Sequence, residues 1–155
     1  MSLASFVEKA RAQVGNGPHT YNSWYGVSDA TAWCAIFVSW CADQAGILTE
    51  ESIADYPSVP KTALVSTMYN WFRDNRRNLA PSGDPDSPNY PRPGDIAFIN
   101  GTSTHVGIIV EVNDNEIKVV EGNTGNDVVS LYTYRNFFNG PSWELTHIGS
   151  NSVAY

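Results

Sequence analysis

The first half of the chain carries apolar residues at the three-to-four-residue spacing typical of helices that bury one side. Residues 3–14 form the first such segment. Ser2 precedes it as an N-cap, and Gly15 follows it as a stop. The apolar stripe of the segment consists of Leu3, Phe6, Val7, Ala10 and Val14. We therefore expect an amphipathic helix at the start of the chain.

A second segment, residues 32–44, is apolar on nearly every side. This pattern predicts a central helix that is buried on most of its faces. Asp29 or Thr31 would cap its start, and Gly46 would end it. The preceding stretch, residues 16–30, is rich in glycine, asparagine, serine and aromatic residues, and we expect it to be a loop.

A third helix is predicted to begin at Ser58 as its N-cap, with Pro60 in the first turn, and to end near Asn75. Its buried side would be formed by Leu64, Met68, Trp71 and Phe72. Residues 79–93 then hold five prolines among serine, aspartate and asparagine, which predicts a long surface loop.

After this loop the pattern changes to short runs of β-branched and aromatic residues, separated by turns that contain asparagine or glycine. The runs cover residues 96–99, 105–112, 116–121, 128–134 and 143–148. Short connections favour antiparallel pairing, so we expect a meander of about five strands. Helices first and strands second indicate an α+β domain, with the N-terminal helices packed on one face of a C-terminal antiparallel sheet.

The length of 155 residues suits one catalytic or binding domain spanning residues 1–155, with a core of about residues 3–149. Nine Lys and Arg against sixteen Asp and Glu give a net charge of −7, which argues against binding to nucleic acid or to an anionic membrane. The opening stretch lacks the apolar region of a signal peptide. No run approaches the roughly 20 apolar residues that a transmembrane helix requires.

The two cysteines, Cys34 and Cys41, are seven residues apart in the predicted central helix. At about 1.5 Å of rise per residue their Cα atoms would lie roughly 10 Å apart, which is too far for a disulfide, so both should be free thiols. Cys34 lies in the first turn, where the helix N-terminus favours a thiolate nucleophile. A buried structural cysteine is the alternative for Cys34, and it suits Cys41 well.

A cysteine nucleophile needs a base, and the chain has three histidines. His105 opens a strand whose following residues are aliphatic, a place where packing alone would not favour an imidazole. A partly exposed residue at a strand end is the plainer interpretation. His19 lies in the predicted loop and His147 in the last strand, and both are weaker candidates, although His147 stays open.

The strand that ends at residue 121 offers the histidine a partner. Glu121 and Asn123 point to the same face because side chains alternate along a strand. If this strand pairs with the strand that carries His105, a carboxylate or an amide can reach the imidazole and fix its tautomer. The alternative is that Glu121 only ends an edge strand and that Asn123 begins a turn.

Four blocks of the sequence then carry a resemblance to a known family. They are Trp33-Cys34-Ala35 followed by Phe37-Val38-Ser39-Trp40, Pro93-Gly94-Asp95-Ile96, His105-Val106-Gly107-Ile108, and Glu121-Gly122-Asn123. In order and spacing they resemble the CHAP domain, the cysteine, histidine-dependent amidohydrolase/peptidase domain of phage and bacterial cell-wall lysins, which belongs to the papain-like cysteine peptidases. The match runs over about residues 3–149. Each block alone is a weak signal, whereas four blocks in family order are specific.

The resemblance implies a papain-like fold with a defined set of catalytic residues. Cys34 would be the nucleophile and His105 the general base, while Glu121 and Asn123 would orient the histidine. The backbone N–H of Cys34 would supply one oxyanion donor. The implied function is a peptidoglycan hydrolase that cuts an amide bond through a thioacyl intermediate, either as an N-acetylmuramoyl-L-alanine amidase or as an endopeptidase of the stem peptide or cross-bridge.

The expected partner is bacterial peptidoglycan. Aromatic residues that could line its groove are Tyr21, Trp24, Tyr25 and Trp143. Some family members bind calcium through aspartates before the cysteine, but residues 22–34 hold only Asp29, so we expect no metal and no cofactor. We expect a monomer that acts at the cell wall. Either it belongs to a longer lysin with a separate wall-binding module, or it reaches the wall by another export route, for example a phage holin.

Two alternatives to this function stay open at the level of sequence. One is a cysteine peptidase or amidase that acts on a substrate outside the cell wall. The other is a catalytically silent wall-binding module that keeps the fold.

Overall fold

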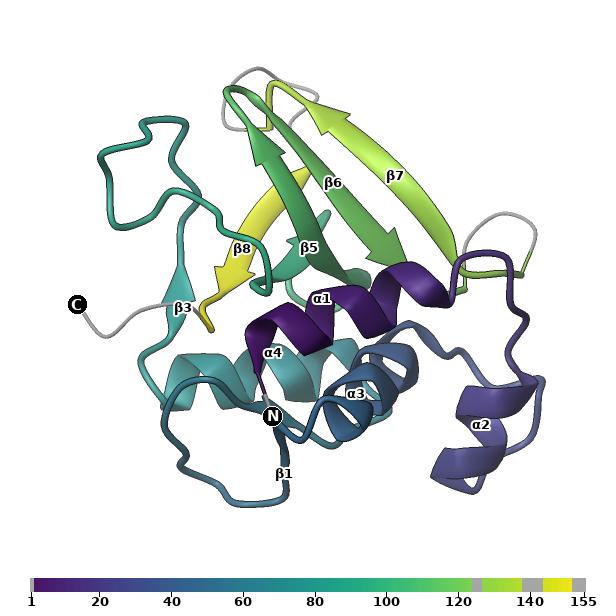
Figure 1. Cartoon of the computed structure of the whole chain (residues 1–155). Coiled ribbons are helices and arrows are strands. Elements are labelled where there is room, and N and C mark those ends of the chain that lie inside the picture. Colours follow the sequence, from purple (N-terminus) through teal and green to yellow (C-terminus); the bar gives the residue numbers. More distant parts are fainter. Residues whose placement is uncertain (1, 124–126, 138–143, 152–155) are drawn as a thin grey trace.

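The computed structural model describes residues 2–123, 127–137 and 144–151 of the chain. Within these residues, four helices and an antiparallel sheet of six strands form the α+β architecture that the sequence predicts. The helices are α1 (Leu3–Ala12), α2 (His19–Tyr25), α3 (Cys34–Gln44) and α4 (Val65–Asp74). Figure 1 shows α1, α3 and α4 together on one side of the sheet, as expected, with α2 beside α3 and away from the strands.

Helix α1 confirms the first predicted helix. It ends two residues earlier than the predicted segment, residues 3–14. The hydroxyl of Ser2 accepts a hydrogen bond from the backbone N–H of Ser5, so Ser2 is the N-cap. Phe6 and Ala10 are fully buried. Because the helix ends at Ala12, Val14 lies outside it and is 47% exposed, in contrast to its predicted place on the buried stripe.

Helix α2 lies inside the stretch 16–30, which the sequence pattern assigned to a loop. Pro18 stands at its N-cap with a helical φ of −75°, and Gly26 ends it in the left-handed conformation with a φ of 95°. Seven residues are too few to display a helical apolar stripe, so the pattern gave no signal. Tyr21 and Asn22 are the buried residues of this helix.

Helix α3 is the predicted central helix, and eight of its eleven residues are buried. Its N-cap is Trp33, which makes no side-chain cap, so the expected capping by Asp29 or Thr31 is wrong. The carboxylate of Asp29 instead bonds the imidazole of His19 at 3.0 Å. Beyond the helix, Gly46 adopts a φ of 74° and turns the chain, as expected for a helix stop.

Helix α4 begins later than the sequence pattern indicates. Its N-cap is Leu64, because residues before it form the strand β2 (Val59–Pro60), which pairs in parallel with β1 (Leu48–Thr49). Ser58 therefore does not cap a helix, and Pro60 is not in a first turn. The buried positions of α4 include Met68 and Phe72 as expected, whereas Leu64 is exposed.

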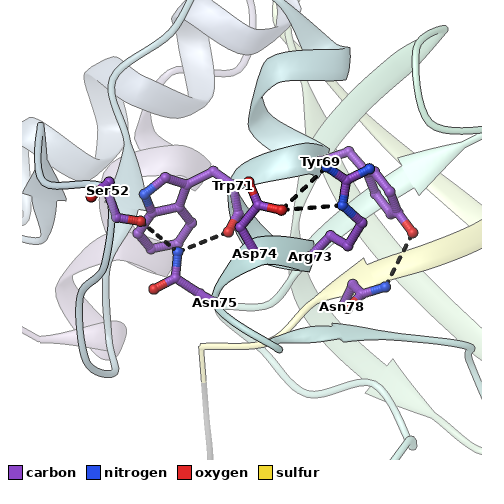
Figure 2. A network of polar contacts seen from close by, with 7 residues as sticks. All are labelled: Ser52, Tyr69, Trp71, Arg73, Asp74, Asn75 and Asn78. Atoms are coloured by element: carbon purple, nitrogen blue, oxygen red, sulfur yellow. Dashed lines mark hydrogen bonds and ion pairs between the residues drawn. The ribbon is translucent and has the colours of Figure 1, made fainter.

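Polar contacts join the C-terminal half of α4 to its surroundings (Figure 2). The side-chain amide of Asn75 donates to the backbone carbonyls of Ser52 and Trp71, at 3.0 and 2.8 Å. The side-chain amide of Asn78 donates to the hydroxyl of Tyr69 at 3.1 Å. These bonds attach the helix to the loop that precedes β2 and to the edge strand β3 (Asn78–Leu79).

The large sheet has the strand order β3-β8-β4-β5-β6-β7. Its other strands are β4 (Ile96–Ile99), β5 (His105–Asn113), β6 (Glu116–Glu121), β7 (Ser130–Arg135) and β8 (Leu145–Gly149). The meander is confirmed from β4 to β7. The last strand departs from it, because β8 returns across the sheet and pairs antiparallel with β4 and with the two-residue strand β3, which the sequence pattern missed.

The sheet is apolar on both faces. On one face, side chains such as Ile108 and Val120 pack with the helices in the main core. On the other face a smaller cluster forms around Ile109 and Val119, and Phe137 and Tyr90 pack against it. Tyr90 comes from the proline-rich loop after β3, so this loop covers part of the second face.

A buried arginine joins the loop before β2 to the C-terminal end of the described chain. Arg77 is 2% exposed, and its guanidinium donates hydrogen bonds to backbone oxygens of Ala54, Ser58 and Ser150 and to the side-chain oxygen of Asn151. Burial lowers the pKa of Arg77 to about 10, which leaves it charged at neutral pH. The guanidinium fork thus satisfies acceptors from the loop between β1 and β2 and from the residues that follow residue 149.

We predict that Arg77→Lys lowers the free energy of unfolding by about 2–4 kcal/mol, because one ammonium cannot satisfy all of these buried acceptors. Urea unfolding of the purified domain measures the change. Arg73→Lys is the matched control, since Arg73 is exposed and pairs with Asp74 at the surface. Equal stability of the two variants would contradict the role of Arg77.

Candidate active site

Cys34 is the first residue of α3 and is 7% exposed. The backbone N–H groups of this first turn have no acceptor within the helix, so the partial positive charge of the N-terminus acts on the sulfur. Both cysteines are free thiols, as predicted. Cys41, two turns further along, is fully buried, and burial raises the pKa of its thiol well above the usual range. Cys41 is therefore a core residue, whereas Cys34 stands at the N-terminus of the helix and is slightly exposed.

His105 is the first residue of β5, and its side chain is 19% exposed. The neighbouring strand β6 pairs with β5, as the sequence hypothesis required. Glu121 ends β6 with its side chain 2% exposed, and its Oε1 lies 2.9 Å from Nε2 of His105. The carboxylate therefore holds the ring by one nitrogen and sets its orientation.

The side chain of Cys34 lies close enough to His105 to affect its protonation. Glu121 bonds Nε2 of His105, so Nδ1 is the ring nitrogen that this carboxylate leaves available. Burial alone would lower the pKa of His105, but the interactions with Cys34 and Glu121 outweigh burial and raise this pKa to about 10. At neutral pH the ring is an imidazolium between a sulfur and a carboxylate, which is the arrangement that stabilises a thiolate.

Two glycines allow these side chains to approach one another. A Cβ on Gly107 would lie 2.8 Å from Cγ of Glu121 and 2.6 Å from Val119, so only glycine leaves room beside the carboxylate. A Cβ on Gly122 would lie 2.7 Å from the ring of Trp33, the residue just before the cysteine. The end of β6 thereby packs directly on the start of α3.

A side-chain hydrogen bond also joins the start of α3 to the segment after β6. The indole N–H of Trp33 donates to the carboxylate of Asp127 at 2.8 Å. Asp127 follows β6 in the chain, so this bond links the residue before Cys34 to the segment after Glu121. The sulfur and the carboxylate are thus positioned by the same contact between the helix layer and the sheet.

The family model of the CHAP domain matches residues 7–123, more than half of the chain and the segment that holds Cys34, His105 and Glu121. The chain belongs to the CHAP family.

Solved structures agree with this assignment at the level of the fold. The crystal structure of Ly7917 with the hydrolyzing product of MDP matches with a TM-score of 0.54 and 18% identity, over 95% of this chain and 62% of that chain. A second crystal structure of Ly7917 matches with a TM-score of 0.54 and 15% identity, over 96% of this chain and 62% of that chain. This CHAP domain thus spans less than two thirds of the chains it resembles. No curated protein matches the sequence.

Asn123, expected beside Glu121 as a second partner of the histidine, lies just beyond β6 with a left-handed φ of 60° and an exposed side chain. Within the described residues, no hydrogen bond joins Asn123 to His105. The hydrogen bond that orients the imidazole comes from Glu121. Of the two residues considered for this position in the CHAP domain, the structure brings the carboxylate to the ring.

The aromatic residues expected in the groove have different environments. Tyr21 is fully buried, stacks on Trp33 with 5.5 Å between ring centroids and donates its hydroxyl to Gln13, so it is a core residue and not a substrate contact. Trp24 and Tyr25 are partly exposed, and the ammonium of Lys61 lies over both rings. Trp143 lies outside the described residues.

The other histidines of this CHAP domain occupy different sites. His19 pairs with Asp29 on the surface. His147 lies in β8 against the ring of Tyr69, and burial lowers its pKa. Of the three histidines, His105 is the one that bonds a buried carboxylate and whose pKa is affected by the side chain of Cys34.

Neither a metal site nor a membrane span is present in the part of the chain that the structure describes. Residues 2–123, 127–137 and 144–151 contain no group of three or more His, Cys, Asp or Glu side chains that could hold a metal ion. None of the helices there is long and apolar enough to cross a membrane.

We predict that Glu121→Gln lowers the pKa of His105 by about one pH unit or more, because the imidazolium loses its buried counter-charge. NMR titration of the ring protons measures this without any substrate. Glu111→Gln is the control. Glu111 lies on β5, the strand of His105, is partly exposed and pairs with Lys118 and Arg11. A His105 titration that is the same in the parent and in Glu121→Gln would contradict the geometry.

Proposed function

We propose that this CHAP domain is a peptidoglycan hydrolase that cuts an amide bond through a thioacyl intermediate on Cys34. The observation that carries the proposal is the 2.9 Å contact between the imidazole of His105 and the carboxylate of Glu121, together with the raised pKa of His105, to which Cys34 contributes. Membership of the CHAP family supports a hydrolase. The likeness to Ly7917, solved with the hydrolyzing product of MDP, supports the same class of substrate.

The first half of the proposed reaction is acylation. The thiolate of Cys34 attacks the carbonyl carbon of the amide and forms a carbon–sulfur bond. The backbone N–H of Cys34, at the N-terminus of α3, would donate to the developing oxyanion. The imidazolium of His105 then gives its proton to the amine nitrogen as the carbon–nitrogen bond breaks.

The second half is deacylation. The neutral imidazole of His105 accepts a proton from a water molecule, which attacks the thioester carbon. The carbon–sulfur bond breaks, the carboxylic acid leaves and the thiolate of Cys34 is restored. Glu121 stays ionised and stabilises the imidazolium that exists between these steps.

The bond cut would be either the muramoyl-to-L-alanine amide or an amide within the stem peptide or cross-bridge. Trp24 and Tyr25 are candidate contacts for this substrate, since their rings are partly exposed. Asn123 is exposed next to Glu121 and is a candidate second polar contact of the histidine or the substrate. The chain would act at the bacterial wall as a monomeric single domain that is linked to a separate wall-binding module.

We predict that Cys34→Ala lowers the rate of peptidoglycan hydrolysis by about a thousandfold or more, because no other group can form the thioester. Cys41→Ala is the matched control: it removes the buried thiol in the same helix and should retain activity in the folded protein. Mass spectrometry of muropeptides from purified walls reads the result. New free amines without new reducing sugar ends identify amide cleavage and show which bond is cut.

Other outcomes of this digestion separate the alternative functions. Wall binding by the parent without any new amine would indicate a silent binding module. Cleavage of simple amides or proteins with intact walls would indicate a substrate outside the wall. Full hydrolysis by Cys34→Ala would contradict the cysteine mechanism.

We predict a bell-shaped dependence of kcat/KM on pH, because a thiolate–imidazolium pair works only between its two ionisations. The raised pKa of His105, about 10, places the loss of activity well above neutral pH, since the leaving amine can take a proton only while the ring is charged. Initial rates measured at constant ionic strength test this profile. An alkaline limb near pH 6.5, the ordinary range of histidine, would contradict the proposed pairing.

A further inference from the structure

Among the residues that the structure describes, each oxygen of the Glu121 carboxylate has a hydrogen-bond partner. Oε1 lies 2.9 Å from Nε2 of His105, and Oε2 accepts a hydrogen bond of 2.5 Å from the hydroxyl of Tyr134. Glu121 is 2% exposed, so water has little access to either oxygen. The tyrosine therefore satisfies an oxygen that would otherwise be buried without a donor.

The sheet directs the phenol of Tyr134 towards this carboxylate. In the register of β6 and β7, Ser130 lies opposite Glu121 and Tyr134 lies opposite Ile117. The side chain of Tyr134 must therefore extend along the strands to reach the carboxylate. Its ring packs against the apolar cluster on the second face of the sheet. The position of the hydroxyl is thus determined by packing as well as by the hydrogen bond.

The phenol remains a donor at the pH at which the site would act. Burial, followed by the negative charge of Glu121, raises the pKa of Tyr134 above its usual range. Glu144 and Tyr132 act in the same direction. Since the hydroxyl keeps its proton, the carboxylate receives one hydrogen bond from a cation and one from a neutral group.

We propose that Tyr134 is a positioning residue that holds the Glu121 carboxylate in the orientation needed to bond His105. The proposal rests on the proposed function, because it assumes that the imidazolium of His105 takes part in the reaction. Tyr134 lies outside residues 7–123, the segment matched by the family model. Its role is inferred from the geometry of this chain, in which β7 supplies a fourth side chain to the site.

Removing the hydroxyl of Tyr134 should change the pKa of His105. The direction of this change distinguishes a positioning role of Tyr134 from withdrawal of negative charge from Glu121. If Tyr134 positions the carboxylate, its loss lets the carboxylate turn away from the ring, and the pKa of His105 falls. If Tyr134 only withdraws negative charge, its loss strengthens the attraction between Glu121 and His105, and the pKa of His105 rises. Tyr134→Phe keeps the ring packing and removes only the hydroxyl.

The test uses NMR titration of His105 in a Cys34→Ala background, where the thiol no longer couples to the imidazole. We expect Tyr134→Phe to lower the pKa of His105, and Tyr132→Phe to leave it unchanged. Tyr132 is the matched control because it lies on the same strand and is 43% exposed. In the Glu121→Gln background, Tyr134→Phe should have no further effect on His105, since Tyr134 acts through the carboxylate.

With Cys34 present, Tyr134→Phe should lower kcat by about tenfold with KM nearly unchanged, because the phenol acts on the site and not on the substrate. An unchanged or raised pKa of His105 in Tyr134→Phe would overturn the proposal. If the walls are not hydrolysed by the parent, the proposed function fails while the titration still tests Tyr134.

A reciprocal measurement keeps Tyr134 intact and covers the case in which Tyr134→Phe does not fold. Coupling between the two groups must act in both directions, so Glu121→Gln should lower the pKa of Tyr134. Titration of the labelled tyrosine ring measures this change. A Tyr134 titration that is insensitive to Glu121→Gln would overturn the proposal independently of any assay.

Discussion

The buried charge of Glu121 is the constraint on which the site depends. An ionised carboxylate with 2% exposure is costly unless hydrogen-bond donors and a counter-charge replace the water it has lost. The imidazolium of His105 supplies the charge, and Tyr134 supplies the second donor. These three side chains come from β5, β6 and β7, so the register of three neighbouring strands has to be correct for the charge to be stable.

The thiol of Cys34 comes from the other layer of the fold. Cys34 is presented by the N-terminus of α3, and the distance between this helix and the sheet determines whether its thiol meets His105. Gly122 lets the end of β6 approach Trp33, and the bond between Trp33 and Asp127 holds that approach. The junction of helix and sheet therefore stabilises the fold and assembles the site with the same contacts.

Part of this arrangement is visible in the sequence, because it depends on local pattern. The apolar central helix, the strands at residues 96–99 and 116–121 and the adjacency of Glu121 to the strand of His105 follow from periodicity and turn residues. Three other features do not follow from local pattern. The helix α2 and the two-residue strand β3 are too short to show a periodicity. The late start of α4 depends on Pro60, which pairs in β2 and does not enter a helix.

Tyr134, which the sequence analysis did not predict as a site residue, shows why the positions of side chains are harder to predict than the strands. Tyr134 is thirteen residues from Glu121, and its hydroxyl reaches the carboxylate only because β7 pairs with β6 in one register and the ring extends along the strand. Tyr21 gives the opposite case. Its aromatic type suggested a groove, but the unexpected helix α2 turns it into the core.

The pairing of Cys34 with His105 is the central claim, and the rate at which iodoacetamide alkylates Cys34 at neutral pH tests it most directly. Peptide mapping by mass spectrometry distinguishes this thiol from Cys41. If the imidazolium stabilises the thiolate, alkylation of Cys34 is fast in the parent and many-fold slower in a folded His105→Ala variant. Equal rates in the two proteins would contradict the account.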